Sequence, residues 1–221
     1  NSPDNTPSTP ERILTVPTVG GIDVVYDEAQ KKWYCITTRA SNVVAVTEFG
    51  NGLGQAPTST NTVTIADLSS VPAPIHMLNV NGDWIGFTIG WKLARIDFGS
   101  DLSNISGAAS VTLSEGYGGV YYGAIYKENN EWYILAAQQI APNATALVRY
   151  DFGTDIYNKT PIATYMSLAP LATVNAGLIR GMTLAHACGQ LYGFIQRENG
   201  TLQKINFSGS IKNTPTLTAT Y

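Results

Sequence analysis

The sequence is poor in charge. Only 13% of its 221 residues are Asp, Glu, Lys or Arg, against about 25% in ordinary soluble domains, and 13 basic and 16 acidic residues leave a net charge of −3. The absence of a basic run argues against a nucleic-acid partner. No apolar stretch reaches the roughly 20 residues of a membrane helix, so we expect no membrane insertion. Low charge with abundant Thr and Asn favours an extracellular, cell-surface or virion location.

Residue types that commonly carry catalysis are also scarce. Histidine occurs only as His76 and His186, and the sequence has no HExxH, Gly-x-Ser-x-Gly or Cys-x-x-Cys motif. Glycosidases need two facing carboxylates, yet most acids here lie in expected hairpin turns and no pair stands out. We therefore expect a non-enzymatic protein without metal or cofactor, in which both histidines are structural.

The chain does contain a repeated strand. Four segments end in Phe followed by Gly or Ser, namely 44–50, 93–99, 147–153 and 202–208. Their phenylalanines, Phe49, Phe98, Phe152 and Phe207, are 49, 54 and 55 residues apart. A period near 50 residues indicates a repeat architecture.

Each repeat contains four short β-type runs separated by polar turns. The tips Asn81-Gly82 and Asn129-Asn130 are typical of tight hairpins. No helical period persists for ten residues. We predict an all-β, propeller-like fold of four-stranded antiparallel blades, with repeats over residues 19–65, 66–113, 114–168 and 169–221. Residues 1–12 are a polar, proline-rich leader and residues 13–221 a single domain.

An aliphatic residue follows each phenylalanine by four positions. We expect the phenylalanines and these aliphatics to form the core between blades; the aliphatics are Leu53, Leu102, Ile156 and Ile211.

The pattern Leu-x-Arg-x-Asp-Phe-Gly-x-x-Leu-x-Asn-x-Pro resembles propeller-type repeats in secreted and surface proteins of Bacteroidetes-like bacteria and of their phages. The likeness covers nearly all of residues 15–221, and the first copy departs from it at Val46, Glu48 and Gln55. The resemblance implies a structural or adhesive scaffold rather than a defined chemistry.

One strand-like run is spare. Ile13, Leu14, Thr15 and Val16 resemble the fourth strand of each repeat but precede the first repeat. This run closes the ring within the chain, or it pairs with a neighbouring subunit and builds a filament, or the chain is part of a larger propeller. In the second case these four residues are assembly residues, and the partners are further copies or other surface or virion proteins.

Two sets of residues are candidates for binding a ligand such as a glycan. One is a glycine-flanked tyrosine cluster, and the other consists of arginines that share a strand face with an aspartate two residues later. These residues are Tyr117, Tyr121, Tyr122, Arg95 and Arg149. The alternatives are packing near the ring axis for the tyrosines and repeated ion pairs for the arginines.

Two covalent modifications are also suggested by the sequence. Asn-x-Ser/Thr sequons make four asparagines candidate glycosylation sites, which are Asn104, Asn143, Asn158 and Asn199. Cys35 and Cys188 lie in the first and last repeats, which would be neighbours in a closed ring. They form a closing disulfide or remain two unpaired small hydrophobic residues.

Together these patterns predict a non-enzymatic, extracellular structural or adhesive module. The alternative is a carbohydrate-binding or carbohydrate-processing propeller domain, which predicts a polar, aromatic-lined pocket on one face of the ring.

Overall fold

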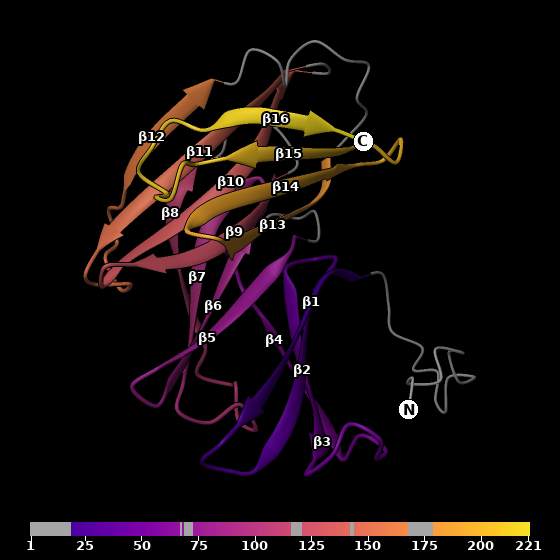
Figure 1. Ribbon diagram of the computed structural model, residues 1–221. Coiled ribbons are helices and arrows are strands. Elements are labelled where there is room, and N and C mark those ends of the chain that lie inside the picture. Colours follow the sequence, from indigo (N-terminus) through magenta and orange to yellow (C-terminus); the bar gives the residue numbers. More distant parts are fainter. Residues whose placement is uncertain (1–18, 67, 69–72, 116–120, 142–143, 168–178) are drawn as a thin grey trace.

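The chain folds as a four-bladed β-propeller. The computed structural model describes residues 19–66, 68, 73–115, 121–141, 144–167 and 179–221, and the regular structure in these ranges is β-sheet (Figure 1). Four four-stranded antiparallel sheets follow one another along the chain, and in each the strand order in the sheet is the order in the sequence. The predicted fold class is therefore confirmed.

The sixteen strands divide evenly among the blades. Blade 1 contains β1 (Val19–Asp27), β2 (Lys32–Arg39), β3 (Val43–Gly50) and β4 (Ser59–Thr64). Blade 2 contains β5 (Ile75–Val80), β6 (Asp83–Ile89), β7 (Lys92–Gly99) and β8 (Ala109–Glu115). Blade 3 contains β9 (Tyr121–Glu128), β10 (Glu131–Ala141), β11 (Ala144–Gly153) and β12 (Ile162–Ser167). Blade 4 contains β13 (Ile179–Ala187), β14 (Gln190–Arg197), β15 (Leu202–Asn206) and β16 (Thr216–Thr220).

The hairpin tips have the backbone geometry that their sequences predict. Asn81 and Gly82 join β5 to β6 with φ of 56° and 96°, and Asn129 and Asn130 join β9 to β10 with φ of 49° and 67°. Two successive positive φ angles match the twist of the flanking strands, and Asn and Gly tolerate them best.

The glycine after each motif phenylalanine has a geometric role. Gly50, Gly99 and Gly153 have φ of 67°, 76° and 66°, and each lies where the register between the second and third strands shifts. Glycine adopts this left-handed conformation without a Cβ penalty. In blade 4 the position is Ser208, which adopts a φ of 51°.

The core lies between blades. Three clusters of buried side chains each join two neighbouring blades, and the motif phenylalanines contribute to all three. Phe98, Phe152 and Phe207 are 5%, 2% and 0% exposed. Leu102, Ile156 and Ile211 are at most 2% exposed, as predicted, and each packs on the blade that precedes its own.

The prediction for the first aliphatic, Leu53, is wrong. Its side chain is 47% exposed. The other three aliphatics are buried by the blade before their own, whereas Leu53 belongs to the first of the described blades.

Some predicted features fall outside the described residues. They are the assembly residues Ile13, Leu14, Thr15 and Val16, together with Tyr117 and Asn143. Among the residues that are described, no helix is long and apolar enough to cross a bilayer.

Candidate functional site

The first strands of the blades bring four equivalent residues to the centre of the propeller. The four residues are equivalent because each pairs with the same position of the adjoining second strand. Asp23, His76, Ala124 and Thr183 pair with Ile36, Phe87, Leu135 and Phe194, which lie three residues after Trp33, Trp84, Trp132 and Leu191. They occupy the same register position on β1, β5, β9 and β13, which are the inner strands of the ring (Figure 1). One position therefore supplies a carboxylate, an imidazole, a methyl group and a hydroxyl.

These four residues line one pocket, which we call the axial pocket. Its volume is about 300 Å³, and neighbours on β5, β9 and β13 complete it, among them Leu78, Tyr126 and Met182. The volume is at the lower end of the range of small-molecule sites, and the wall combines polar and apolar groups.

Asp23 is held in place by backbone amides. Its Oδ1 accepts a hydrogen bond from the Val24 amide at 2.8 Å, and its Oδ2 accepts one from the Met77 amide of blade 2, also at 2.8 Å. A carboxylate oxygen has two lone pairs, so each oxygen retains capacity for a further donor. The carboxylate thus joins blades 1 and 2 while remaining able to accept hydrogen bonds in the pocket.

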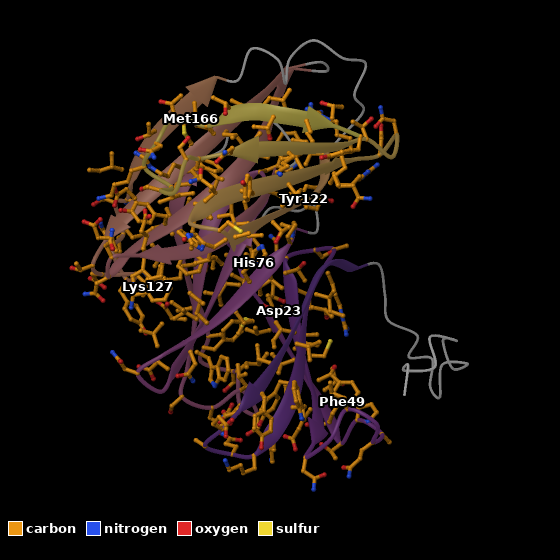
Figure 2. The ribbon with its side chains drawn as sticks, in the orientation of Figure 1. Asp23, Phe49, His76, Tyr122, Lys127 and Met166 are labelled. Carbon is orange, nitrogen blue, oxygen red and sulfur yellow. The ribbon has the colours of Figure 1, made fainter. Side chains whose placement is uncertain are left out.

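His76 presents an unpaired nitrogen. Its Nε2 is buried and has no hydrogen-bond partner in the described structure. Burial lowers the pKa of the imidazole below its ordinary value, although the Asp23 carboxylate and a backbone hydrogen bond at Gly123 act in the opposite direction. Figure 2 shows Asp23 and His76 on their neighbouring inner strands. A neutral ring that donates to the backbone leaves Nε2 as an unpaired, buried acceptor.

The lowered pKa of His76 predicts a pH dependence of stability. The unfolded chain binds a proton at a pKa near 6.5, whereas the folded chain binds it only at lower pH. In that window the unfolded state holds more protons, so the free energy of unfolding falls as the pH drops below about 6.5. Urea unfolding at several pH values should show this loss in the wild type and a smaller loss in His76→Gln. His186→Gln, at an exposed histidine, is the matched control and should behave as the wild type. If wild type and His76→Gln lost the same free energy of unfolding at low pH, His76 would not be the source of the pH dependence.

The arginines predicted as ligand residues connect blades instead of lining the axial pocket. Arg95 of blade 2 donates to both carboxylate oxygens of Asp97 and, at 2.7 Å, to the Tyr157 carbonyl of blade 3. Arg149 of blade 3 donates at 3.0 Å to the Ile211 carbonyl of blade 4. The two arginines are equivalent positions of successive repeats, so the motif arginine is an interblade clamp.

The tyrosine cluster is described only in part. Tyr122 is half-buried and packs on the core between blades 3 and 4 (Figure 2). For Tyr121 the structure describes the backbone, in β9, and Tyr117 lies outside the described residues. The aromatic residue that does line the axial pocket is Tyr126, four positions beyond Tyr122.

Three of the candidate glycosylation sites lie in described turns. Asn104 and Asn199 are exposed, and their Oδ1 atoms accept hydrogen bonds from Ser106 Oγ at 2.8 Å and from the Thr201 amide at 3.0 Å. Asn158 is half-buried; its Oδ1 accepts from the Thr160 amide and its Nδ2 donates to the Phe152 carbonyl. These asparagines therefore stabilise turns, as Asx residues commonly do.

Of the two alternatives for the cysteines, the structure has the unpaired one, because both are free. Cys35 lies within β2, where it pairs with Val24 and Thr47, whereas Cys188 is exposed in the turn between β13 and β14. One is at mid-strand in blade 1 and the other at the end of a hairpin in blade 4. Burial raises the pKa of the Cys35 thiol.

The sequence interpretation missed Asp23 and Thr183 and assigned His76 to structure alone. A signal was present: Asp23 is a charged residue within an otherwise apolar first strand. When the four first strands are aligned by the residues that they pair with in the second strands, Asp23, His76 and Thr183 occupy the same register position. Within the described residues no three His, Cys, Asp or Glu side chains are grouped closely enough to hold a metal ion.

No protein-family model matches the chain, and no curated protein matches it significantly. Its fold is similar to solved glycoside hydrolases. An endo-arabinase from Bacteroides thetaiotaomicron has a TM-score of 0.62 at 10% identity, over 95% of this chain and 84% of the enzyme. An α-L-arabinofuranosidase from Lactobacillus brevis has a TM-score of 0.63 at 8% identity, over 90% and 72%. A GH43 β-1,3-galactosidase has a TM-score of 0.57 at 9% identity, over 88% and 73%. At these identities the comparisons establish one point: the chain has a β-propeller fold resembling that of the GH43 glycoside hydrolases.

Proposed function

We propose that the protein binds carbohydrate in the axial pocket and does not hydrolyse it. The observation that carries this proposal is the convergence of Asp23, His76 and Thr183 from three blades on a pocket that Tyr126 also lines. A sugar offers hydroxyls that both donate and accept hydrogen bonds, and apolar C–H faces that pack on aromatic and aliphatic side chains. The pocket supplies complementary groups of both kinds.

The number of carboxylates favours binding over hydrolysis. Glycosidases commonly use two carboxyl groups about 5–10 Å apart, one as an acid and the other as a base or nucleophile. Among the described residues that line the axial pocket, Asp23 is the single carboxylate. Both of its oxygens already accept backbone hydrogen bonds that fix its orientation. An extracellular adhesive role remains compatible with this proposal, because glycan binding is one means of adhesion.

Calorimetric titration with arabinose- and galactose-containing oligosaccharides tests the proposal. These sugars are chosen because the structurally similar enzymes include an arabinase and a galactosidase. We expect saturable binding that Asp23→Asn weakens about tenfold or more, equivalent to about 1.4 kcal/mol, through loss of an acceptor oxygen. Asp83→Asn, at an exposed aspartate in the β5–β6 hairpin, should bind as the wild type.

Two further readouts complete this test. Thermal melts of Asp23→Asn establish that the variant is folded, and chromatography of the incubated sugars detects hydrolysis. Equal loss of affinity in Asp83→Asn, or full affinity in Asp23→Asn, would contradict the axial site. Release of shorter sugars that Asp23→Asn abolishes would instead identify a hydrolase.

A further inference from the structure

The carboxylate of Asp23 is held by one backbone amide from each of two neighbouring inner strands. Its Oδ1 accepts a hydrogen bond from the amide of the following residue, Val24 on β1, and its Oδ2 accepts one from the Met77 amide on β5, each at 2.8 Å. We call the pair of amides of Val24 and Met77 the first cradle. It shows that the inner strands of this propeller can bind a carboxylate with backbone groups alone.

The same pair of positions exists between blades 3 and 4. The four register-equivalent residues of the axial pocket are each followed by a residue that is equivalent too, and these following residues are Val24, Met77, Ile125 and Leu184. The counterparts of the first cradle in blades 3 and 4 are therefore the amides of Ile125 on β9 and Leu184 on β13, which we call the second cradle. The strands β9 and β13 contact each other, as β1 and β5 do (Figure 1).

Both amides of the second cradle face the axis of the propeller. Along an antiparallel pair, successive residues alternate between bonding to the partner strand and facing away from it. Met77, Ile125 and Leu184 each lie four residues before a two-residue turn in which both φ angles are positive, so their positions in the alternation are the same. The Met77 amide faces away from β6, since it donates to Asp23. The amides of Ile125 and Leu184 face away from their second strands in the same way, and both residues line the axial pocket.

The second cradle lacks a side chain that could fill it. Between blades 1 and 2 the bridging side chain is Asp23, and between blades 2 and 3 it is His76, which bonds to the backbone at Gly123. Between blades 3 and 4 the equivalent residue is Ala124, whose methyl group accepts no hydrogen bond. Outside the strand ladders, the hydrogen bonds among the described residues include none from the amides of the second cradle. These amides are therefore available to an acceptor from a ligand.

We propose that the axial pocket binds an acidic sugar, whose carboxylate accepts hydrogen bonds from the amides of Ile125 and Leu184. This inference rests on carbohydrate binding in the axial pocket and names the class of sugar. A hydrogen bond from an amide to an ionised oxygen is about twice as strong as one to a neutral oxygen. Thr183 and Tyr126, next to the second cradle, line the pocket where the sugar ring would lie.

The charge of Asp23 does not prevent such binding. Asp23 lies between blades 1 and 2, whereas the second cradle lies between blades 3 and 4. The repulsion between two carboxylates falls with their separation and with salt. Asp23 also accepts hydrogen bonds from two amides of its own, which stabilise its charge.

Calorimetric titration of the wild-type protein with matched sugars tests the inference. Oligomers of galacturonate, their methyl esters and the corresponding galactose oligomers share one ring and differ only at C6. We expect the galacturonate oligomers to bind about tenfold or more tightly than either neutral ligand, because the ester and the hydroxymethyl group carry no ionised oxygen. Acetate, which offers a carboxylate without a sugar ring, should bind far more weakly.

Ala124→Asp tests the location of the carboxylate. This variant supplies the second cradle with a carboxylate from the chain itself, as Asp23 does in the first, and should abolish the preference for galacturonate over galactose. Ala187→Asp is the matched control, because it adds the same charge at an exposed position of β13 where blades 1 and 3 have Asp27 and Glu128. It should keep the preference. Thermal melts establish that both variants are folded, and the comparison of ligands on the wild type does not depend on either.

The outcomes separate this inference from the proposed function. If galactose oligomers bound as tightly as galacturonate oligomers, the preference for an acidic sugar would be wrong and carbohydrate binding would stand. If none of these sugars bound, both would be wrong. Acetate binding as tight as that of galacturonate oligomers would show a carboxylate site that does not recognise sugar, and an unchanged preference in Ala124→Asp would show that the carboxylate binds elsewhere. Either result would overturn the inference.

Discussion

Phe152→Ala is expected to lower the free energy of unfolding by about 3–5 kcal/mol, because it leaves a cavity in a core that cannot collapse freely. The Phe152 side chain is 2% exposed in the cluster between blades 2 and 3. Its ring meets that of Phe87 edge-on, with centroids 5.7 Å apart. Removing the ring therefore deletes buried apolar area and an aromatic pair across the interface.

Leu53→Ala is the control for this loss. Leu53 occupies the repeat position of a core aliphatic but is about half exposed, so its truncation should cost less than about 1 kcal/mol. Urea unfolding of both variants and the wild type measures the difference. If the two variants lost similar stability, the core would not lie between blades as described here.

Arg95→Leu is expected to cost about 2–4 kcal/mol, since it removes a buried guanidinium together with its hydrogen bonds to Asp97 and to the Tyr157 carbonyl. The Arg95 side chain is 3% exposed and makes hydrogen bonds of 2.7 and 3.1 Å to the Asp97 carboxylate. It also donates to the Tyr157 carbonyl and lies 5.1 Å from the centroid of that ring. Leucine leaves the carbonyl without this donor, while the partly exposed Asp97 regains some solvation.

Arg180→Leu provides the comparison for Arg95→Leu. The Arg180–Glu198 pair has a similar distance of 2.7 Å, but the two side chains are 49% and 41% exposed. Solvent screening makes such pairs worth about 0–1 kcal/mol. Chemical unfolding should thus separate the two variants clearly. An Arg95→Leu loss as small as that of Arg180→Leu would mean that the clamp does not stabilise the blade 2–3 interface.

The fold could be predicted because each repeat encodes it locally. Period-2 strands, Asn-rich hairpin tips and the glycine after each phenylalanine depend on neighbouring residues alone, and the repetition shows which features are structural. The buried aliphatics Leu102, Ile156 and Ile211 follow from the same repetition. Leu53 shares their sequence position, and its exposure depends on which blades are neighbours in space.

The axial site was less accessible to sequence reasoning. Asp23, His76, Ala124 and Thr183 share a register position but no chemistry, so they do not form a recognisable motif. The predicted ligand-binding sites were residues that recur in the repeats, such as Arg95 and Arg149. In this protein the recurring residues stabilise the fold instead. The residues that differ between blades at an equivalent position are those that can make a specific pocket.

The most direct test of the axial site uses the two histidines of the chain. With only His76 and His186 present, the imidazole signals in an NMR spectrum divide into two sets, and His186→Gln assigns them. Adding the oligosaccharide that binds most tightly in calorimetry should shift the His76 signals and leave those of His186 unchanged. Unchanged His76 signals at saturation, or a shift at His186 alone, would contradict carbohydrate binding in the axial pocket.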